Sequence, residues 1–238
     1  MTARPNVEAL LFDVFGTVVD WRRSIIDDLG AFGAERGLSL DWAAFADDWR
    51  ALYQPAMEEV RSHRRAWTIL DVLHRESLGK LCAKYGIAGL SEADKDHINK
   101  VWHRLRPWPD TVEGLTRLKS RYIIGTLSNG NVALLLNMAK RADLPWDMIF
   151  SAELAQAYKP APACYRSVPN FLRIEPREVM LVAAHNGDLV AAAREGLRTG
   201  FVTRPAEYGP HQTRDFKAEH DFDVVGRDFV HLAELMGA

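Results

Sequence analysis

The sequence predicts an α/β fold in which a parallel sheet is covered by helices and interrupted by a helical domain. Three observations carry this prediction. Residues 7–12 form a short, largely apolar run that fits a strand buried on both faces. Helical periodicity then holds almost without a break over residues 21–106. Beyond it, strand and helix patterns alternate to the end of the chain, as they do in parallel sheets.

The helical block after the first strand is predicted to form a cap domain. Within it we expect helices at 24–35, 41–61, 67–85 and 91–105. Ser91 is the expected N-cap of the last helix, and two prolines in residues 106–110 end it. A helical insertion at this point would overhang the carboxyl end of the first strand. We therefore predict a core of residues 1–20 and 107–238 and a cap of residues 21–106.

The second part of the core is predicted from the alternation that resumes after the prolines. The expected strands are 122–127, 148–151, 179–183, 199–202 and an edge strand at 223–225. The expected helices are 111–120, 132–141, 161–172, 189–195 and 229–236. A parallel sheet covered on both faces follows from this order.

Composition narrows the function classes. The 238 residues carry a formal net charge of -2, which gives no reason to expect nucleic acid or an anionic membrane as partner. No apolar run approaches the roughly 20 residues that span a bilayer, and residues 1–6 lack a signal pattern. We therefore expect a cytoplasmic protein. Cys82 and Cys164 fit no metal spacing and are expected to stay reduced thiols.

Polar side chains stand at the carboxyl ends of four predicted strands. They are Asp13 and Thr17, Ser128 and Asn129, Tyr158 and Lys159, and His185, Asn186 and Asp188. Each group has an ordinary structural explanation: an acid that caps a turn or helix, a Ser-Asn-Gly turn, a Lys-Pro helix entry. Because the carboxyl ends of parallel strands meet at one edge of a sheet, we expect these side chains to share one site.

The string FDVFGTVVD at residues 12–20 resembles the first motif of the haloacid dehalogenase superfamily. Most members are phosphatases with the pattern Asp-x-Asp-x-Thr, whose second acid protonates the leaving alcohol. Phe15 stands at that position here and cannot deliver a proton. This version resembles the type II branch, the L-2-haloacid dehalogenases, whose halide leaving group needs no proton. The resemblance covers nearly the whole chain and implies a Rossmann-like core with an inserted helical cap.

The activity that this resemblance implies is hydrolysis of short 2-haloacids, haloacetates or L-2-haloacids, to 2-hydroxy acids through an aspartyl ester. Asp13 matches the nucleophile, with the hydroxyl of Thr17 beside it. Lys159 matches the motif lysine, Tyr165 its partner, and Asp188 the acid that supports ester hydrolysis. These roles are chemically consistent: a carboxylate nucleophile divides the displacement into two steps, a lysine keeps it ionised, and a second acid can orient or deprotonate water.

The resemblance also implies how the substrate is held. Ser128 and Asn129, with backbone amides near Val14 and Phe15, match the groups that bind the substrate carboxylate. Arg50, in a Trp-Arg pair, matches the halide-binding arginine. An arginine on an amphipathic helix is usually solvated, but the neighbours of Arg50 are aromatic and apolar and favour a partly buried face. A planar guanidinium suits developing halide charge.

The loop after the predicted strand at 179–183 departs from the family pattern. The family string Ser-Ser-Asn-x-Trp-Asp becomes Ala-Ala-His-Asn-Gly-Asp, so His185 replaces an asparagine and Gly187 a tryptophan. Asn186 is expected to support the site, and Trp67 to lie near the substrate. His185 is expected either to donate to the halide with Arg50 or to contact Asp188 or Lys159. With both donors, fluoroacetate should be a substrate as well as chloroacetate.

Metal and partner expectations complete the prediction. Phosphatase relatives hold magnesium through oxygen ligands that include the second acid of the first motif and another acid in a Gly-Asp-x-x-x-Asp loop. Phe15 removes the first, and no acid follows Asp188 in residues 189–191. We therefore expect no metal and no cofactor. The family often forms dimers, which leaves a homodimer open. A small-molecule phosphatase of the same superfamily and a non-catalytic relative remain the alternatives.

Overall fold

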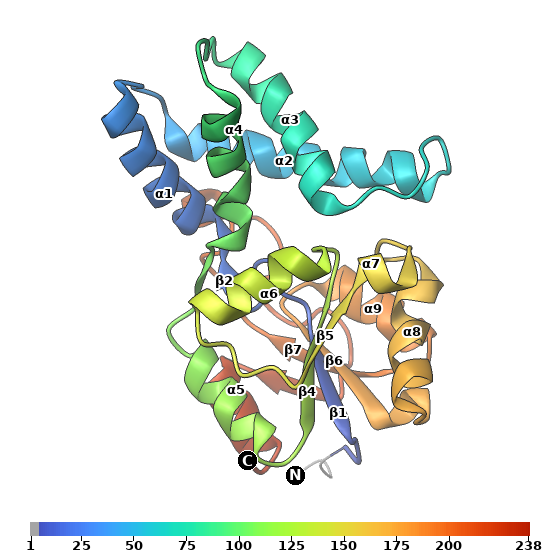
Figure 1. Ribbon diagram of the computed structural model, residues 1–238. Coiled ribbons are helices and arrows are strands. Elements are labelled where there is room, and N and C mark those ends of the chain that lie inside the picture. The colour runs from blue at the N-terminus through green and yellow to red at the C-terminus, as the bar shows by residue number, and fades with distance from the viewer. Residues whose placement is uncertain (1–4) are drawn as a thin grey trace.

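The structure, a computed structural model, describes residues 5–238. Residues 1–4 lie outside the described part. They belong to the predicted core segment 1–20 and to the stretch 1–6, which lacks a signal pattern. The described chain forms a parallel sheet flanked by helices, and further helices stand above one end of it (Figure 1). The prediction of an α/β core with a helical cap is confirmed.

The sheet has six strands in the order β5-β4-β1-β6-β7-β8, and all neighbours are parallel. The strands are β1 (Ala9–Phe12), β4 (Ile123–Ser128), β5 (Met148–Ser151), β6 (Val179–Ala183), β7 (Arg198–Val202) and β8 (Val224–Gly226). The chain passes from β1 to one side and later to the other, so the strand order reverses at β1. A crevice at the carboxyl end of β1 is where such sheets bind ligands.

The core helices cover the two faces of this sheet (Figure 1). They are α5 (Thr111–Lys119), α6 (Val132–Arg141), α7 (Ala152–Ala155), α8 (Pro162–Leu172), α9 (Asn186–Arg194) and α10 (Phe229–Leu235), with the 3-10 turns η2 (Pro176–Glu178) and η3 (Gly209–His211). Helix α9 begins three residues before the expected position 189. His185 is extended and serves as its N-cap residue, which puts Asp188 in the first turn. An acid is favourable there because it faces the positive end of the helix dipole.

The cap contains α1 (Trp21–Arg36), α2 (Trp42–Arg61), α3 (Leu70–Lys84), α4 (Glu92–Asn99) and the 3-10 turn η1 (Lys100–His103). Helix α3 starts at Leu70 and not at residue 67. The preceding segment is held outside the helix because Thr68 accepts hydrogen bonds at its hydroxyl from Arg65 (2.9 Å) and at its carbonyl from Tyr158 (2.7 Å). The helix expected at 91–105 has its predicted Ser91 cap but tightens into η1 after Asn99.

Core and cap are joined by a two-stranded antiparallel ribbon, β2 (Val19–Asp20) with β3 (Arg106–Pro107). Its strands are two residues long, too short to leave a sequence pattern, and it was not predicted. The backbone N–H of Arg106 also donates to the hydroxyl of Ser24 in α1 (2.9 Å). The chain thus enters and leaves the cap at one place, which fixes the cap above the carboxyl ends of the strands.

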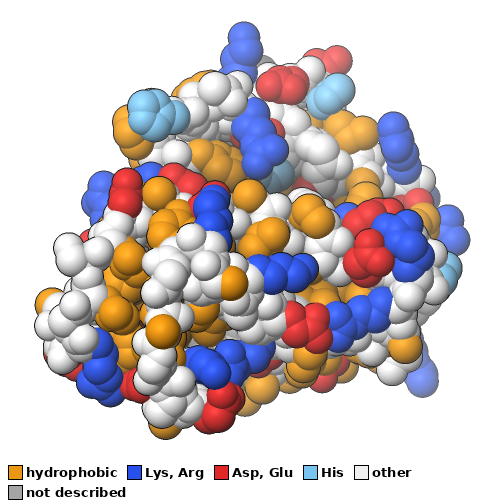
Figure 2. Space-filling model, turned by 90° about the horizontal axis from the view of Figure 1, so that it is seen from above, with side chains coloured by type: hydrophobic (Ala, Val, Ile, Leu, Met, Phe, Trp, Pro, Cys, Tyr) orange, Lys and Arg blue, Asp and Glu red, His pale blue; other side chains and the backbone are white. Residues whose placement is uncertain are grey.

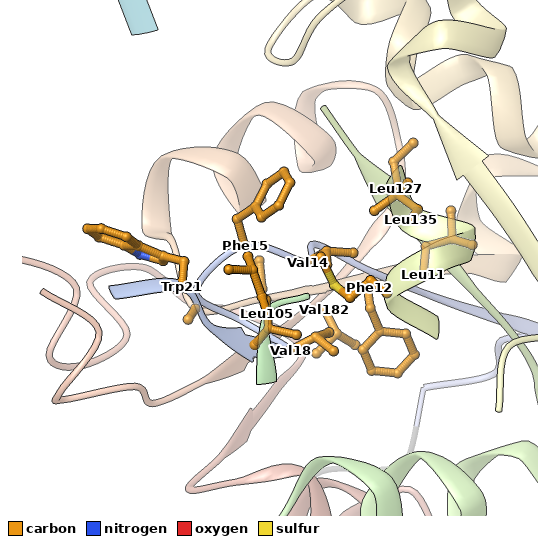
Figure 3. Close-up of a cluster of buried hydrophobic side chains, with 14 of the residues drawn as sticks. Leu11, Phe12, Val14, Phe15, Val18, Trp21, Leu105, Leu127, Leu135 and Val182 are labelled. Carbon is orange, nitrogen blue, oxygen red and sulfur yellow. The ribbon is translucent and has the colours of Figure 1, made fainter. Parts of the chain in front are cut away.

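Two phenylalanines near the end of β1 serve different parts of the structure, and their rings point to opposite sides in Figure 3. Phe12 packs in the core, with ring centroids 5.4 Å from Trp146 and 5.3 Å from Phe229. Phe15 packs against the cap, 5.7 Å from Trp102 and 6.3 Å from Tyr53. Burial of such a ring stabilises by about 1.5–3 kcal/mol. Phe15 therefore packs the turn after β1 against the cap.

Positive and negative side chains are interspersed on the face seen from above (Figure 2). Many are paired on the cap, as in Arg36–Asp94, Arg65–Glu76 and Arg75–Glu92. Within residues 5–238, no helix is long and apolar enough to cross a membrane. The cytoplasmic location and the homodimer stay predictions.

Candidate active site

A cavity of about 450 Å³ lies between the carboxyl ends of the strands and the cap. The core lines it with Asp13, Phe15, Asn129, Lys159, Pro160, Tyr165, His185, Gly187 and Asp188. Helix α2 of the cap adds Arg50, Tyr53 and Gln54, and the long segment after β7 adds Tyr208, Arg214 and Asp215. Side chains that are far apart in the sequence thus line one cavity at the switch point of the sheet.

Asp13 directly follows β1, and the chain then turns at Gly16, whose φ of +90° is in the region that favours glycine. The Asp13 side chain is 10% exposed. Its Oδ1 accepts from Lys159 Nζ (2.9 Å), and its Oδ2 accepts from Thr17 Oγ1 (2.8 Å) and lies 3.1 Å from His185 Nδ1. Burial alone would raise the pKa of Asp13, but Lys159 and His185 outweigh it and hold this pKa far below its usual value. Asp13 is therefore ionised.

Lys159 lies between two carboxylates in the turn before α8. Its Nζ contacts Asp13 and also Asp188 (2.5 Å), and the hydroxyl of Tyr165 donates to the other oxygen of Asp188 (2.6 Å). Burial opposes the charge of Lys159, yet the two carboxylates raise its pKa, so it remains an ammonium. Asn129 accepts from the backbone N–H of Lys159 (2.8 Å) and fixes this turn. Lys159 thus links the carboxylates of Asp13 and Asp188.

Arg50 reaches the cavity from α2. Its guanidinium lies over the rings of Tyr53 (4.3 Å to the centroid) and Trp21 (5.4 Å). Its Nη1 is buried and has no hydrogen-bond partner among residues 5–238. Burial disfavours the charge, but Tyr53, Tyr208, Glu207 and Asp13 together raise the pKa of Arg50. The cavity therefore contains a permanent cation that no carboxylate neutralises directly.

His185 also lines the cavity, but its surroundings differ from both expectations. Its Nδ1 lies near Asp13, and its Nε2 lies 2.9 Å from Oε2 of Glu207. Neither nitrogen remains to donate to a halide, and the ring pairs with neither Asp188 nor Lys159. Burial would lower the pKa of His185, but the two carboxylates raise it well above the usual value. The ring is an imidazolium held between two anions.

Several predicted site residues do not line the cavity. Ser128 is fully buried and accepts from the backbone N–H of Gly130 (3.2 Å). Asn186 donates to Asp215 (2.9 Å), and Trp67 packs on Tyr158 with centroids 4.7 Å apart. The hydroxyl of Thr17 donates to Asp13 Oδ2 and accepts from the N–H of Ala184 (2.9 Å).

The turn after β1 contains Val14 and Phe15, whose backbone amides were expected to bind the substrate carboxylate. The backbone hydrogen bonds of this turn are donated by Gly16, Val18 and Val19 and not by Val14 or Phe15. The ring of Phe15 lines the cavity, whereas the side chain of Val14 does not. Their N–H groups thus stay candidates for an anionic substrate.

Other cavity residues escaped prediction from the sequence. Residues 203–223 connect β7 to β8 and contain only the short turn η3. They supply the cavity residues Tyr208, Arg214 and Asp215, and also Glu207, which contacts His185. The sequence of this connection has neither the helical nor the strand period of apolar residues. The usable signal was the length of this connection, because long loops at the carboxyl end of a strand are often functional.

The described residues contain no group of three or more His, Cys, Asp or Glu side chains that could hold a metal ion. The acids at this site are instead bound to cations: Asp13 to Lys159 and His185, and Asp188 to Lys159. The charges of the site are thus balanced by side chains of the chain itself.

Comparison with known proteins agrees with this geometry. The family described as haloacid dehalogenase-like hydrolase matches residues 7–196. The (S)-2-haloacid dehalogenase 4A of Burkholderia cepacia is 29% identical over 211 residues, which cover 85% of this chain and 87% of that protein. The solved structure of the defluorinating L-2-haloacid dehalogenase Rha0230 is 47% identical, with a TM-score of 0.96 over 98% of this chain and 96% of its own. That of the L-2-haloacid dehalogenase PA0810 is 48% identical, with a TM-score of 0.95 over 97% and 99%.

These similarities extend over nearly the whole chain and are high enough to establish relationship, and they confirm the resemblance seen in the first motif. The chain belongs to the haloacid dehalogenase-like hydrolase family and, within it, to the L-2-haloacid dehalogenase branch.

Proposed function

We propose that this protein hydrolyses short 2-haloacids to 2-hydroxy acids through a covalent ester on Asp13. The observation that carries the proposal is the position of the ionised Asp13 in a cavity that also presents the cation of Arg50. An anionic nucleophile and a separate cation suit a reaction in which an anion attacks and a halide leaves. The activities named for the relatives support the same reaction.

In the first step, a carboxylate oxygen of Asp13 attacks the carbon that bears the halogen. The new C–O bond forms as the carbon–halogen bond breaks, and its electrons leave with the halide. Asn129 and the N–H groups of Val14 and Phe15 hold the substrate carboxylate. The guanidinium of Arg50 stabilises the charge that develops on the halogen. No proton is needed for this departure, which agrees with an apolar ring at Phe15.

In the second step, water hydrolyses the ester. Asp188 accepts a proton from the attacking water, since each of its oxygens keeps a lone pair beside its bonds to Lys159 and Tyr165. The product leaves as the 2-hydroxy acid, and Asp13 returns as a carboxylate. Because one close relative is named as defluorinating, we include fluoroacetate among the proposed substrates.

A halide-release panel tests the proposal. We expect chloride and bromide from the haloacetates and from L-2-chloropropionate, far less from the D enantiomer, and slower fluoride release from fluoroacetate. Mass spectrometry of enzyme quenched during turnover should show the ester adduct on the peptide that contains Asp13. The absence of halide from every substrate would reject the proposed function.

Replacement of Arg50 tests the halide role. We expect Arg50→Gln to slow release by roughly 10²–10³-fold, the usual cost of one donor to developing negative charge. The matched control is Arg36→Gln, a surface arginine of the cap that pairs with Asp94. Equal, small effects of both substitutions would remove Arg50 from the reaction.

Replacement of Phe15 separates this function from the phosphatase alternative. We expect Phe15→Asp to give no efficient magnesium-dependent phosphatase, because no further acid follows Asp188 in the loop. The new carboxylate would lie among the rings of Tyr53 and Trp102, so stability should fall by several kcal/mol. Phosphate release from p-nitrophenyl phosphate with and without magnesium checks this. Efficient metal-dependent release by the variant would contradict our interpretation of the segment after β6, which contains Asp188.

A further inference from the structure

His185 and Glu207 form a charged pair against the nucleophile that the two steps above do not use. The Glu207 side chain is 1% exposed. Its Oε2 faces His185 Nε2 (2.9 Å), and its Oε1 accepts from Trp21 Nε1 (3.1 Å). A Cβ on Gly16 would lie 2.1 Å from Oε1, so this carboxylate rests directly on the glycine of the nucleophile turn. A buried charge fixed so tightly beside the reacting group calls for a chemical explanation.

The contacts of Asp13 distinguish its two oxygens. Oδ2 is engaged by two groups, Thr17 Oγ1 and His185 Nδ1, whereas Oδ1 receives only Lys159 Nζ. A carboxylate oxygen has about two lone-pair directions. Both are occupied on Oδ2, so Oδ1 is the oxygen with a lone pair for attack. Oδ1 then becomes the ester oxygen, and Oδ2 becomes the carbonyl oxygen of the intermediate.

We propose that Thr17 and His185 form the oxyanion hole in which the Asp13 ester is hydrolysed. This inference rests on the proposed function. Water attacks Cγ of Asp13, gives a proton to Asp188, and pushes the carbonyl electrons onto Oδ2. The Thr17 hydroxyl and the His185 Nδ1–H donate to that oxygen. When the tetrahedral centre collapses, the Cγ–Oδ1 bond breaks and the leaving oxygen takes the proton from Asp188. Asp13 keeps the oxygen from water as a carboxylic acid and releases the remaining proton to solvent, which restores the carboxylate.

Glu207 is a positioning residue in this scheme. A neutral imidazole has one N–H, so one of its two carboxylate partners would face a lone pair; only the imidazolium donates to both. Formation of the ester removes the negative charge of Asp13, and Glu207 is then the anion left in contact with the ring. Its charge keeps His185 protonated during hydrolysis. The remaining charged or titratable groups that line the same cavity are Arg50, Tyr53, Lys159, Tyr165, Asp188, Tyr208, Arg214 and Asp215.

The test uses Glu207→Gln and His185→Gln with chloroacetate. We expect a burst of about one chloride per enzyme, then turnover slowed roughly 10²–10³-fold, because the second step has lost its donor. The ester should accumulate and be visible by mass spectrometry. Glu113→Gln, an exposed acid on α5, is the matched control and should behave as wild type. If Glu207→Gln does not fold, Trp21→Phe removes the N–H that holds Glu207, together with part of a buried ring that lies under Arg50, and should give a smaller effect on ester hydrolysis in the same direction.

The pH profile separates donation from general-base catalysis. A donor must be protonated, so ester hydrolysis should fall as pH rises through the pKa of His185. In Glu207→Gln this fall should move to lower pH, because the anion that favours the imidazolium is gone. Loss of hydrolysis at low pH is expected from protonation of Asp188 alone. A low-pH loss that shifts in Glu207→Gln would instead mark His185 as the base and would overturn the proposal.

Two further outcomes are informative. A slow first chloride release without a burst would place His185 in ester formation and overturn this inference, while the proposed function would stand. Absence of chloride release by wild type would instead reject the proposed function itself.

Discussion

Asp13→Asn is expected to abolish turnover, with a loss on the order of 10⁴–10⁶-fold, as for removal of other catalytic nucleophiles. An amide has nearly the shape of the carboxylate but is a poor nucleophile. The fold should survive because the cations that contact Asp13 keep other partners: Lys159 retains Asp188, and His185 retains Glu207. Halide release and circular dichroism of the variant test both parts.

The control for this variant is chemical. An asparagine at a nucleophilic position can hydrolyse to aspartate and restore activity, so the mass of the peptide with residue 13 must be measured after each assay. Near-normal halide release by enzyme with an intact asparagine would remove the covalent mechanism.

Much of the site could be placed from the sequence because its residues directly follow strands. Asp13, Asn129 and Asp188 each come shortly after a buried apolar run, and the carboxyl ends of parallel strands meet at one edge whatever the loops contain. Lys159 follows β5 after one short helix. The sheet topology alone therefore predicts that these four side chains lie close together. No knowledge of their contacts is needed for this prediction.

The contacts of His185 could not be predicted in this way. Its partner Glu207 comes from residues 203–223, where no period relates one residue to another. The position of Glu207 depends on a hydrogen bond from Trp21, 186 residues earlier, and on the space above Gly16. Such tertiary contacts leave no local pattern. The halide role expected for His185 did not take account of Asp13 and Glu207, the two carboxylates that its ring nitrogens face.

Phe15 shows how a chemical inference can be incomplete. The sequence indicated why no acid is needed there: halide leaves without a proton. The structure adds a packing reason, since the ring joins Tyr53 and Trp102 of the cap to the nucleophile loop. Which cap residues meet this loop depends on how the ribbon β2–β3 orients the cap, and strands of two residues give no signal in the sequence.

Lys159→Met is expected to cause the second large effect. Methionine keeps most of the side-chain volume but leaves Asp13 and Asp188 without the cation that lies between them. Removal of one partner from a buried ion pair costs about 3–5 kcal/mol of unfolding free energy. Turnover should fall at least about 10³-fold, because a partly protonated Asp13 attacks poorly and Asp188 is no longer positioned for water.

The loss of unfolding free energy expected for Lys159→Met should depend on pH in a definite direction. In the wild type the pKa of Asp13 is far below its unfolded value, so its stabilisation is present above the unfolded pKa and disappears only in acid. In the variant, mutual repulsion should raise the pKa of one carboxylate, and stability should then fall as pH rises through it. The difference in unfolding free energy between the two proteins should therefore be larger at pH 8 than at pH 5.

Urea unfolding at both pH values measures this difference. Lys100→Met is the matched control, since Lys100 forms an exposed pair with Asp96 that should be worth less than about 1 kcal/mol at either pH. An equal deficit at pH 5 and pH 8 would show that the two acids do not repel each other once Lys159 is gone. Another cation, with Arg50 and His185 the nearest candidates on the same cavity, would then have to compensate for its charge.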